Sequence, residues 1–280
     1  MDRLLPTTVV GSYSVPEWLE RLKTDFYRRR LSSAHLAEIH DVAIKAALKD
    51  QELAGIDIVS DGELRRDNDV DYLLARIPGV RATTTVKSYY FDYYDLVVVG
   101  ELAPEPVGLA RDFRFTREHT DRPIKFSLTG PFSLSCRVRD ETYHDRAALV
   151  RALAGVLNAE ARELVAAGAT QLQIDEPFLA GYPEMVGLAV EAINLVTEGV
   201  EATWGLHVCY GNRYARPSWE GHYAFLFPAV LAAAVDELVL EFARKGDEDV
   251  RTISQLGWDR ALGLGVLDVK SEDVEPGELV

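Results

Sequence analysis

The sequence predicts an α/β protein organised as a TIM-type barrel of parallel strands. Short apolar segments alternate along the chain with longer amphipathic segments of helical period, and repeated strand–helix units are typical of a parallel sheet. Several strand-like segments end in polar or acidic residues, among them Ser12, Glu63 and Asp175, and barrel enzymes carry their sites at these ends of the strands. A doubly wound dinucleotide-binding sheet is less favoured, because no Gly-x-Gly-x-x-Gly follows the first strand.

The expected helices begin and end at recognisable residues. Ser32 or Ser33 can cap the first long helix and Asp145 another, and Gly55 and Gly168 end these two. Residues 13–33 show no clear helical pattern, whereas aromatic and β-branched residues over 86–101 predict an antiparallel hairpin. We expect strands over 7–12, 56–60, 124–129, 170–175, 204–209, 238–242 and 262–269, and helices over 34–54, 106–119, 145–167, 184–198, 223–234 and 247–256.

Composition limits the classes of function. The chain has 280 residues, 48 % of them apolar, and a formal net charge of −15, which fits one catalytic barrel domain over residues 1–280. The negative charge argues against a nucleic-acid partner and against an anionic membrane surface, and no apolar run is long enough to span a bilayer. The two cysteines, Cys136 and Cys209, and the lack of a signal-peptide pattern predict a cytoplasmic location.

The stretch from Trp204 to Asn212 is the strongest candidate for chemistry. It predicts a short strand that carries His207 and Cys209 two residues apart, so that both side chains face the same side. An imidazole and a thiol are good zinc ligands, and the thiol binds as a thiolate. The alternative is a buried structural cysteine beside a hydrogen-bonded histidine.

Glu241 strengthens the metal interpretation. It lies in the apolar strand Leu238-Val-Leu-Glu-Phe242, and a buried carboxylate must be paired, protonated or bound to a metal. His207, Cys209 and Glu241 would supply three ligands from two neighbouring strands and leave a fourth position for a substrate, as in catalytic zinc sites.

Polar groups at other strand ends suggest a pocket for an amino acid. Glu63 and Asp175 could hold a substrate ammonium group, and Gly11 and Ser12 could offer an amide and a hydroxyl to its carboxylate. The alternative for the acids is structural, with surface ion pairs around Glu63 and a capped turn after Asp175.

Together these stretches resemble the catalytic C-terminal barrel of cobalamin-independent methionine synthases and their shorter single-barrel relatives. They span nearly the whole chain in the order found in that family. The matching motifs are Leu5-Pro-Thr-Thr-Val-Val-Gly-Ser12, Ser60-Asp-Gly-Glu63 with Arg66-Asp67, Leu128-Thr-Gly-Pro131, Gln173-Ile-Asp-Glu-Pro177, His207-Val-Cys-Tyr210, Leu240-Glu241 and Gly265-Val-Leu-Asp-Val-Lys-Ser271.

The resemblance implies methyl transfer to the thiol of homocysteine in a zinc-dependent TIM barrel, with the segment 86–101 as an excursion from the barrel. His207, Cys209 and Glu241 match three zinc ligands of the family. Ser12, Glu63 and Asp175 match residues that hold the backbone of homocysteine, with Glu63 and Asp175 counted among the catalytic groups.

Some positions depart from the family pattern. The family has a second cysteine ligand on an eighth strand beyond Gly-Val-Leu-Asp-Val, and this chain ends at Val280 before such a strand, so we expect a barrel that lacks its last strand and helix. Arg137 stands where the long enzymes have an aromatic residue that packs on folate. Lys270 takes the place of a histidine proposed to protonate the departing folate, and we place it among the catalytic residues.

These departures keep several functions open. The methyl donor could be methyltetrahydrofolate or a methyl-corrinoid carried by a partner protein. A second interpretation keeps the zinc thiolate but adds a thiol such as coenzyme M to an epoxide. A third is an inactive or truncated relative.

Overall fold

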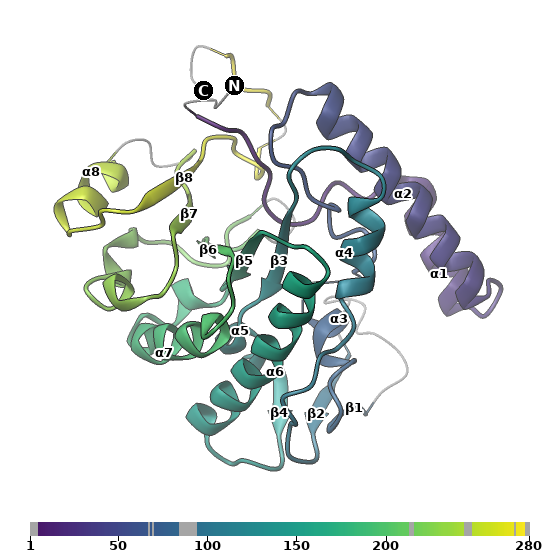
Figure 1. Cartoon of the computed structure of the whole chain (residues 1–280), viewed down its shortest axis with the longest axis horizontal. Coiled ribbons are helices and arrows are strands. Elements are labelled where there is room, and N and C mark those ends of the chain that lie inside the picture. Colours follow the sequence, from purple (N-terminus) through teal and green to yellow (C-terminus); the bar gives the residue numbers. More distant parts are fainter. Residues whose placement is uncertain are drawn as a thin grey trace.

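The protein is described from a computed structural model that covers residues 5–66, 68, 70–83, 94–212, 216–243, 248–271 and 273–277. Its centre is a parallel sheet of five strands in the order β3, β5, β6, β7, β8 (Figure 1). The strands are β3 (Lys125–Thr129), β5 (Gln171–Asp175), β6 (Thr203–Val208), β7 (Glu237–Glu241) and β8 (Ala261–Gly265).

Two more strand positions extend this sheet on its β3 side. Thr8 forms a parallel bridge with Ile58, and Val59 forms one with Ile124, next to β3. The seven strand positions thus follow one another in chain order, all parallel, as in a TIM barrel. Every strand expected from the sequence is present, although the first two are reduced to single bridges.

Barrel closure is not detected. Within the described residues, no backbone pairing joins β8 to the segment around Thr8. The side chain of Leu264 on β8 is 49 % exposed, consistent with an edge strand. The expectation of an incomplete barrel is confirmed.

Side chains alternate across the barrel wall. Phe126 of β3 packs edge-on against Phe113 at a ring-centroid separation of 6.0 Å, so this residue faces the surrounding helices. Ser127 faces the interior, and in the strand register it is paired with Gln173. Two residues further along β5, Asp175 also faces the interior and is paired with His207 of the neighbouring β6. At these positions the barrel turns polar residues inward, toward the site.

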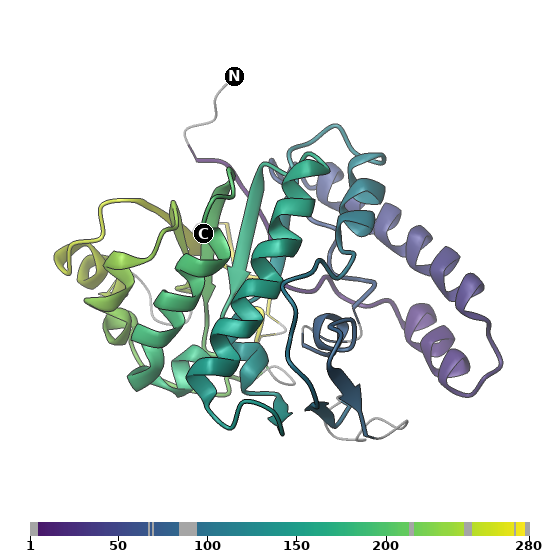
Figure 2. The ribbon, with the colours of Figure 1, turned by 60° about the horizontal axis from the view of Figure 1, so that its bottom comes forward.

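The helices cover the outside of the sheet. Figures 1 and 2 show α6 and α7 side by side along it, and α1 packed against α2 on another flank. Ser32 caps α2 by accepting from the amide of His35, and Asp145 caps α6 by accepting from the amide of Ala147, as expected. The helices are α1 (Glu17–Tyr27), α2 (Ser33–Leu53), α3 (Asp71–Leu74), α4 (Ala110–Arg117), α5 (Pro131–Ser135), α6 (Arg146–Ala166), α7 (Val186–Thr197) and α8 (Glu248–Gln255), with 3-10 turns η1 (Leu179–Gly181), η2 (Pro183–Met185), η3 (Tyr223–Leu226) and η4 (Ala229–Ala232).

Two expectations for helices were wrong. Residues 13–33 contain the helix α1, whose inward stripe consists of Leu19, Leu22 and Phe26 together with the buried stem of Lys23. Because this apolar stripe is narrow and interrupted by charged residues, the sequence of 13–33 shows no clear helical period. The single helix expected over 223–234 is instead the two 3-10 turns η3 and η4, because the proline between them has no amide hydrogen to continue a helix.

The expected hairpin exists, with a different first arm. β1 (Val80–Ala82) pairs antiparallel with β2 (Leu96–Val98), so pairing begins before residue 86, and residues 84–93 lie outside the described part. β2 also pairs in parallel with β4 (Val138–Asp140). This small sheet lies apart from the barrel, at the same end of the molecule as α5, which follows β3 directly (Figure 1). In the described residues, no helix is long and apolar enough to cross a membrane.

Candidate active site

A hydrogen bond with the backbone orients the His207 imidazole in a way that suits metal binding. It is the second-last residue of β6, and its Nδ1 lies 2.9 Å from the carbonyl oxygen of Val239 on β7. A carbonyl oxygen can only accept, so Nδ1 carries the hydrogen and Nε2 is left for another partner. Metal-binding histidines are commonly oriented in this way.

Negative groups surround the His207 imidazole. Burial by itself lowers the pKa of His207, but the charge and hydrogen bond of Cys209 and the charge of Asp175 raise it to about 9. Without a metal, the imidazole is therefore a cation held by these two neighbours. A metal cation bound here would balance the negative charges of Cys209 and Asp175 in place of the protonated imidazole.

Glu241 ends β7 and forms an ion pair with a predicted catalytic residue. Lys270 Nζ donates to Glu241 Oε1 at 2.5 Å, and the two side chains are only 4 % and 14 % exposed. The other carboxylate oxygen, Oε2, is buried and has no hydrogen-bond partner among the residues that the structure describes. Lys270 neutralises a carboxylate that would be costly to bury alone, and Oε2 keeps a lone pair free.

Tyr223 links the strand ends that carry Cys209 and Glu241. Its hydroxyl donates to the carbonyl of Val208 at 3.1 Å and accepts from the amide of Glu241 at 3.0 Å. Burial strongly raises the pKa of Tyr223, so its hydroxyl keeps the hydrogen that it donates. Its role could not be predicted from the sequence, because nothing in the local pattern of 223–226 distinguishes it from a core aromatic.

Glu63 is held in a strained turn at the mouth of the barrel. Its φ is 57°, in the left-handed region that side chains rarely adopt, and its amide donates to Asp61 Oδ1 at 2.9 Å. The Ser127 hydroxyl donates to Glu63 Oε1 at 2.7 Å, and Arg66 Nη1 lies 3.5 Å from the same oxygen. Such strain is typical of functional positions. Ser127, which sequence reasoning missed, could have been found from its inward position on β3.

Ser12 meets Glu63, as the predicted substrate pocket requires. Its hydroxyl donates to Glu63 Oε2 at 3.3 Å. Gly11 has a φ of 75°, which a glycine adopts readily. The amide of Tyr13, two residues further along, donates to the carbonyl of Gly62 at 2.8 Å. The segments that carry Gly11, Ser12 and Glu63 are thus fastened together.

Asp175 connects this acid group to the histidine. Gln173 Nε2 donates to Asp175 Oδ1 at 2.6 Å. Burial raises the pKa of Asp175 and so does the charge of Glu63, whereas the charges of His207 and Arg66 lower it. Ser12, Glu63, Asp175 and His207 are therefore linked as one polar group: Ser12 is hydrogen-bonded to Glu63, the charges of Glu63 and His207 act on Asp175, and Asp175 and His207 are paired in neighbouring strands.

The three predicted metal ligands are near one another in the fold without forming a complete shell. His207 lies in β6, Cys209 follows the end of that strand directly, and Glu241 ends the adjacent β7. Across the described ranges, no three histidine, cysteine, aspartate or glutamate side chains are grouped closely enough to hold a metal. The donor types fit a zinc ion: His207 Nε2 is left to face Cys209, because Val239 takes Nδ1, and Glu241 Oε2 has no hydrogen-bond partner in the described part of the chain. The metal site stays a prediction.

Comparison with known proteins decides the family. The sequence model of the cobalamin-independent synthase catalytic domain matches residues 5–280. The chain belongs to the cobalamin-independent methionine synthase family. It is 34 % identical to a methionine synthase of Saccharolobus islandicus, over 99 % of this chain and 81 % of that protein. It is 33 % identical to one of Sulfurisphaera tokodaii, over 100 % and 80 %.

A solved structure agrees with this assignment. The B12-independent methionine synthase of Shewanella sp. W3-18-1, determined in complex with selenomethionine, superposes with a TM-score of 0.85 at 27 % identity, over 99 % of this chain and 84 % of that one. The resemblance deduced from the motifs is confirmed, and the chain is a methyltransferase of the methionine synthase type with a TIM-barrel fold. The cobalamin-independent description of the family does not support a corrinoid partner.

Glu176, next to Asp175 in the family motif, has a structural role. It is fully buried and accepts from the amides of Phe132 and Ser133 and from the Ser133 hydroxyl, at 3.1, 2.8 and 2.6 Å. These groups belong to the start of α5, so Glu176 ties this short helix to the end of β5. Burial raises the pKa of Glu176 to about 7, against the opposing effect of these hydrogen bonds.

Two other side chains that could take part in chemistry, His222 and Cys136, make contacts with residues outside the predicted site. His222 Nδ1 lies 3.2 Å from Asp249 Oδ1 of α8, a contact with a residue outside the predicted metal ligands. Cys136 is partly buried, with Arg146 Nη1 3.4 Å from its sulfur, and burial raises its pKa to about 11. Such a thiol is unreactive at neutral pH, as expected for a packing residue.

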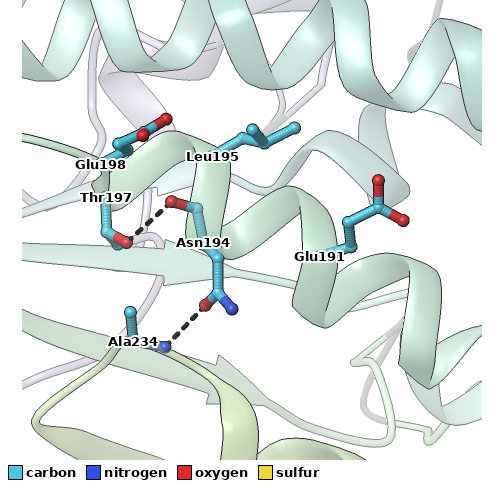
Figure 3. A pocket seen from close by; sticks show the side chains of 6 residues that line it. All are labelled: Glu191, Asn194, Leu195, Thr197, Glu198 and Ala234. Carbon is cyan, nitrogen blue, oxygen red and sulfur yellow. Dashed lines mark hydrogen bonds between the residues drawn. The ribbon is translucent and has the colours of Figure 1, made fainter.

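A surface hollow of about 510 Å³ lies at the end of α7, away from the predicted site residues (Figure 3). Asn194 closes one side of it by accepting from the amide of Ala234 at 2.7 Å and donating to the carbonyl of Ala232 at 2.9 Å. Both ends of this amide are used to fasten α7 to the segment before β7. The hollow is therefore a consequence of packing.

The pKa of Glu176 predicts a pH dependence of stability. Because the folded pKa of about 7 exceeds the ordinary 4.5, the unfolded state loses its proton first, and the free energy of unfolding falls as the pH rises from about 4.5 to 7. This group accounts for a loss of about 3 kcal/mol. In urea denaturation, the stability of the wild type relative to Glu176→Gln should fall by that amount as the pH rises through this window. A difference that does not change with pH contradicts the assignment. Glu191→Gln is the control, because Arg151 lowers the pKa of Glu191 and the change should be small and of opposite sign.

The ion pair of Lys270 predicts a large stability effect. In metal-free protein, Lys270→Met should lower the free energy of unfolding by about 3–5 kcal/mol, because it leaves the Glu241 carboxylate buried without a partner. Lys49→Met, which removes an exposed pair with Glu52, should cost at most about 1 kcal/mol. Equal costs for the two variants, measured by urea denaturation, would show that the buried pair has no special weight.

Proposed function

We propose that this chain transfers a methyl group to the thiol of homocysteine at a zinc site formed by His207, Cys209 and Glu241. The observation that carries the proposal is the linked polar group of Ser12, Glu63, Asp175 and His207. In this arrangement, groups suited to an amino-acid backbone would lie beside groups suited to a metal-bound sulfur.

The chain's own residues would bind and orient the acceptor. Glu63 and Asp175 would take the ammonium group, and the Ser12 hydroxyl and Gly11 amide the carboxylate, as charge-assisted hydrogen bonds. Arg66, which is buried beside Glu63, balances part of the negative charge. It keeps Glu63 oriented whether or not the substrate is present. The fixed geometry would align the acceptor sulfur with the methyl donor.

Zinc, when bound, would convert the acceptor thiol, whose ordinary pKa is about 8.5, into a thiolate at neutral pH. His207 would contribute Nε2, held outward by the carbonyl of Val239. Glu241 would contribute Oε2, since Lys270 occupies Oε1. Cys209 would contribute its thiolate.

The methyl donor we propose is methyltetrahydrofolate, in keeping with a family described as cobalamin-independent. When the methyl group moves to the acceptor sulfur, the donor nitrogen that loses it needs a proton. We assign Lys270 this catalytic role, because its ammonium group lies at the strand end that carries Glu241. Arg137 would face the donor in place of an aromatic ring.

We also propose that residues 1–280 form a single catalytic domain that works in the cytoplasm. The described strands and helices build one barrel with one small attached sheet. Both cysteines are free, as expected in a reducing compartment.

Zinc content and methionine formation test the proposal together. Wild-type protein should hold about one zinc per chain and form methionine from homocysteine and methyltetrahydrofolate. Cys209→Ser should lose zinc, with a loss of activity greater than the about 10- to 100-fold that follows removal of an outer partner of a metal ligand. The matched control is Cys136→Ser, the same change at the other free cysteine, which should keep both zinc and activity.

Two results would overturn the proposal. One is equal zinc in wild type and Cys209→Ser. The other is calorimetry in which coenzyme M, a thiol without an ammonium group for Glu63 and Asp175, binds more tightly than homocysteine. That second result would favour thiol transfer to an epoxide.

A further inference from the structure

Tyr223 occupies an unusual place between two strands of the barrel. It lies in η3, after the segment that follows β6, and its side chain is fully buried. The hydroxyl has one hydrogen bond with each strand, donating to Val208 of β6 and accepting from Glu241 of β7. A side chain from outside the sheet therefore joins two of its strands through their backbones.

These contacts lie where the strand pairing ends. The parallel register of β6 and β7 extends as far as Val208 and Leu240. Cys209 and Glu241 are the next residues of the two strands, so the register does not by itself fix their relative position. The Tyr223 hydroxyl supplies the bond between the strands at this step.

The aromatic ring of Tyr223 also contacts the residues that follow Cys209 and Glu241. Its centroid lies 4.9 Å from that of Tyr210, the residue after Cys209, and 6.0 Å from that of Phe242, the residue after Glu241. Aromatic pairs at these separations stabilise a defined geometry. Both predicted ligands are thus held on each side by contacts with one tyrosine.

We propose that Tyr223 is a positioning residue for the metal site: its hydroxyl holds the Cys209 and Glu241 strand ends at the separation at which both can bind one zinc ion. The inference rests on the proposed function, since it presupposes that these residues share a metal. Tyr223 touches neither the metal nor the substrate in this account. It acts through the backbone of the ligands, as outer groups of metal sites commonly do through ligand side chains.

The test is the zinc affinity of Tyr223→Phe, which removes one oxygen atom and keeps the ring. The matched control is Tyr143→Phe, because the Tyr143 hydroxyl also accepts from a backbone amide, that of Leu102 at 2.8 Å, in another part of the molecule. Dissociation constants are measured by competition with a chelator of known affinity. We expect zinc to bind Tyr223→Phe about 10- to 100-fold more weakly than wild type, and Tyr143→Phe with unchanged affinity.

The outcomes separate this inference from the proposed function. If wild type holds zinc through Cys209 and Tyr223→Phe binds it equally well, the positioning role is wrong and the proposed function stands. If wild type holds no zinc, the proposed function itself fails. A similar loss of affinity in both tyrosine variants would mean that general destabilisation is the cause, which also overturns the inference.

A measurement on the wild type covers the case in which Tyr223→Phe does not fold. Zinc should slow hydrogen exchange at the amide of Glu241 and across η3, because a metal that bridges the strand ends also stabilises the hydrogen bonds of Tyr223. Slowed exchange at both places supports the inference. Exchange that slows at Cys209 and is unchanged at Glu241 and η3 contradicts it.

Discussion

The pairing of β6 with β7 is the constraint on which the candidate site depends. Parallel strands in register bring their carboxyl ends to one edge, so Glu241 lies near His207 and Cys209 although it follows Cys209 by about thirty residues along the chain. The same pairing places the carbonyl of Val239 where it can orient the His207 imidazole. A slip of one residue would turn His207 and Cys209 toward the helices and bury Leu206 and Val208 in the barrel interior.

The mouth of the barrel gathers buried charges that are stable only together. Arg66 lies beside Glu63, Lys270 pairs with Glu241, and His207 offsets Asp175. Each ion would be costly to bury alone. Burial nevertheless raises the pKa of Asp175, as it does that of Asp61. Acids whose pKa is raised by burial are prepared for a cationic partner, such as a substrate ammonium group or a metal, whose arrival favours their ionised form.

The architecture could be predicted from the sequence because it rests on local patterns. Alternating strands and helices, caps such as Asp145 and polar strand ends predicted the barrel and the residues at its mouth. The stripe of α1 was missed because charges interrupt it, and the continuous helix expected over 223–234 failed at a proline. Contacts between segments that are distant along the chain could not be predicted from the sequence. Neither the pairing of Lys270 with Glu241 nor the bridge from Tyr223 leaves a local signal, since each depends on how separate loops fold over the strand ends.

X-ray absorption at the zinc edge, recorded on the zinc-loaded protein before and after addition of homocysteine, tests the central claim most directly. The account predicts a shell with one sulfur from Cys209 and nitrogen and oxygen from His207 and Glu241. Homocysteine should then add a second sulfur at about 2.3 Å. A sulfur count that does not change when homocysteine is bound would contradict activation of the thiol by zinc at this site.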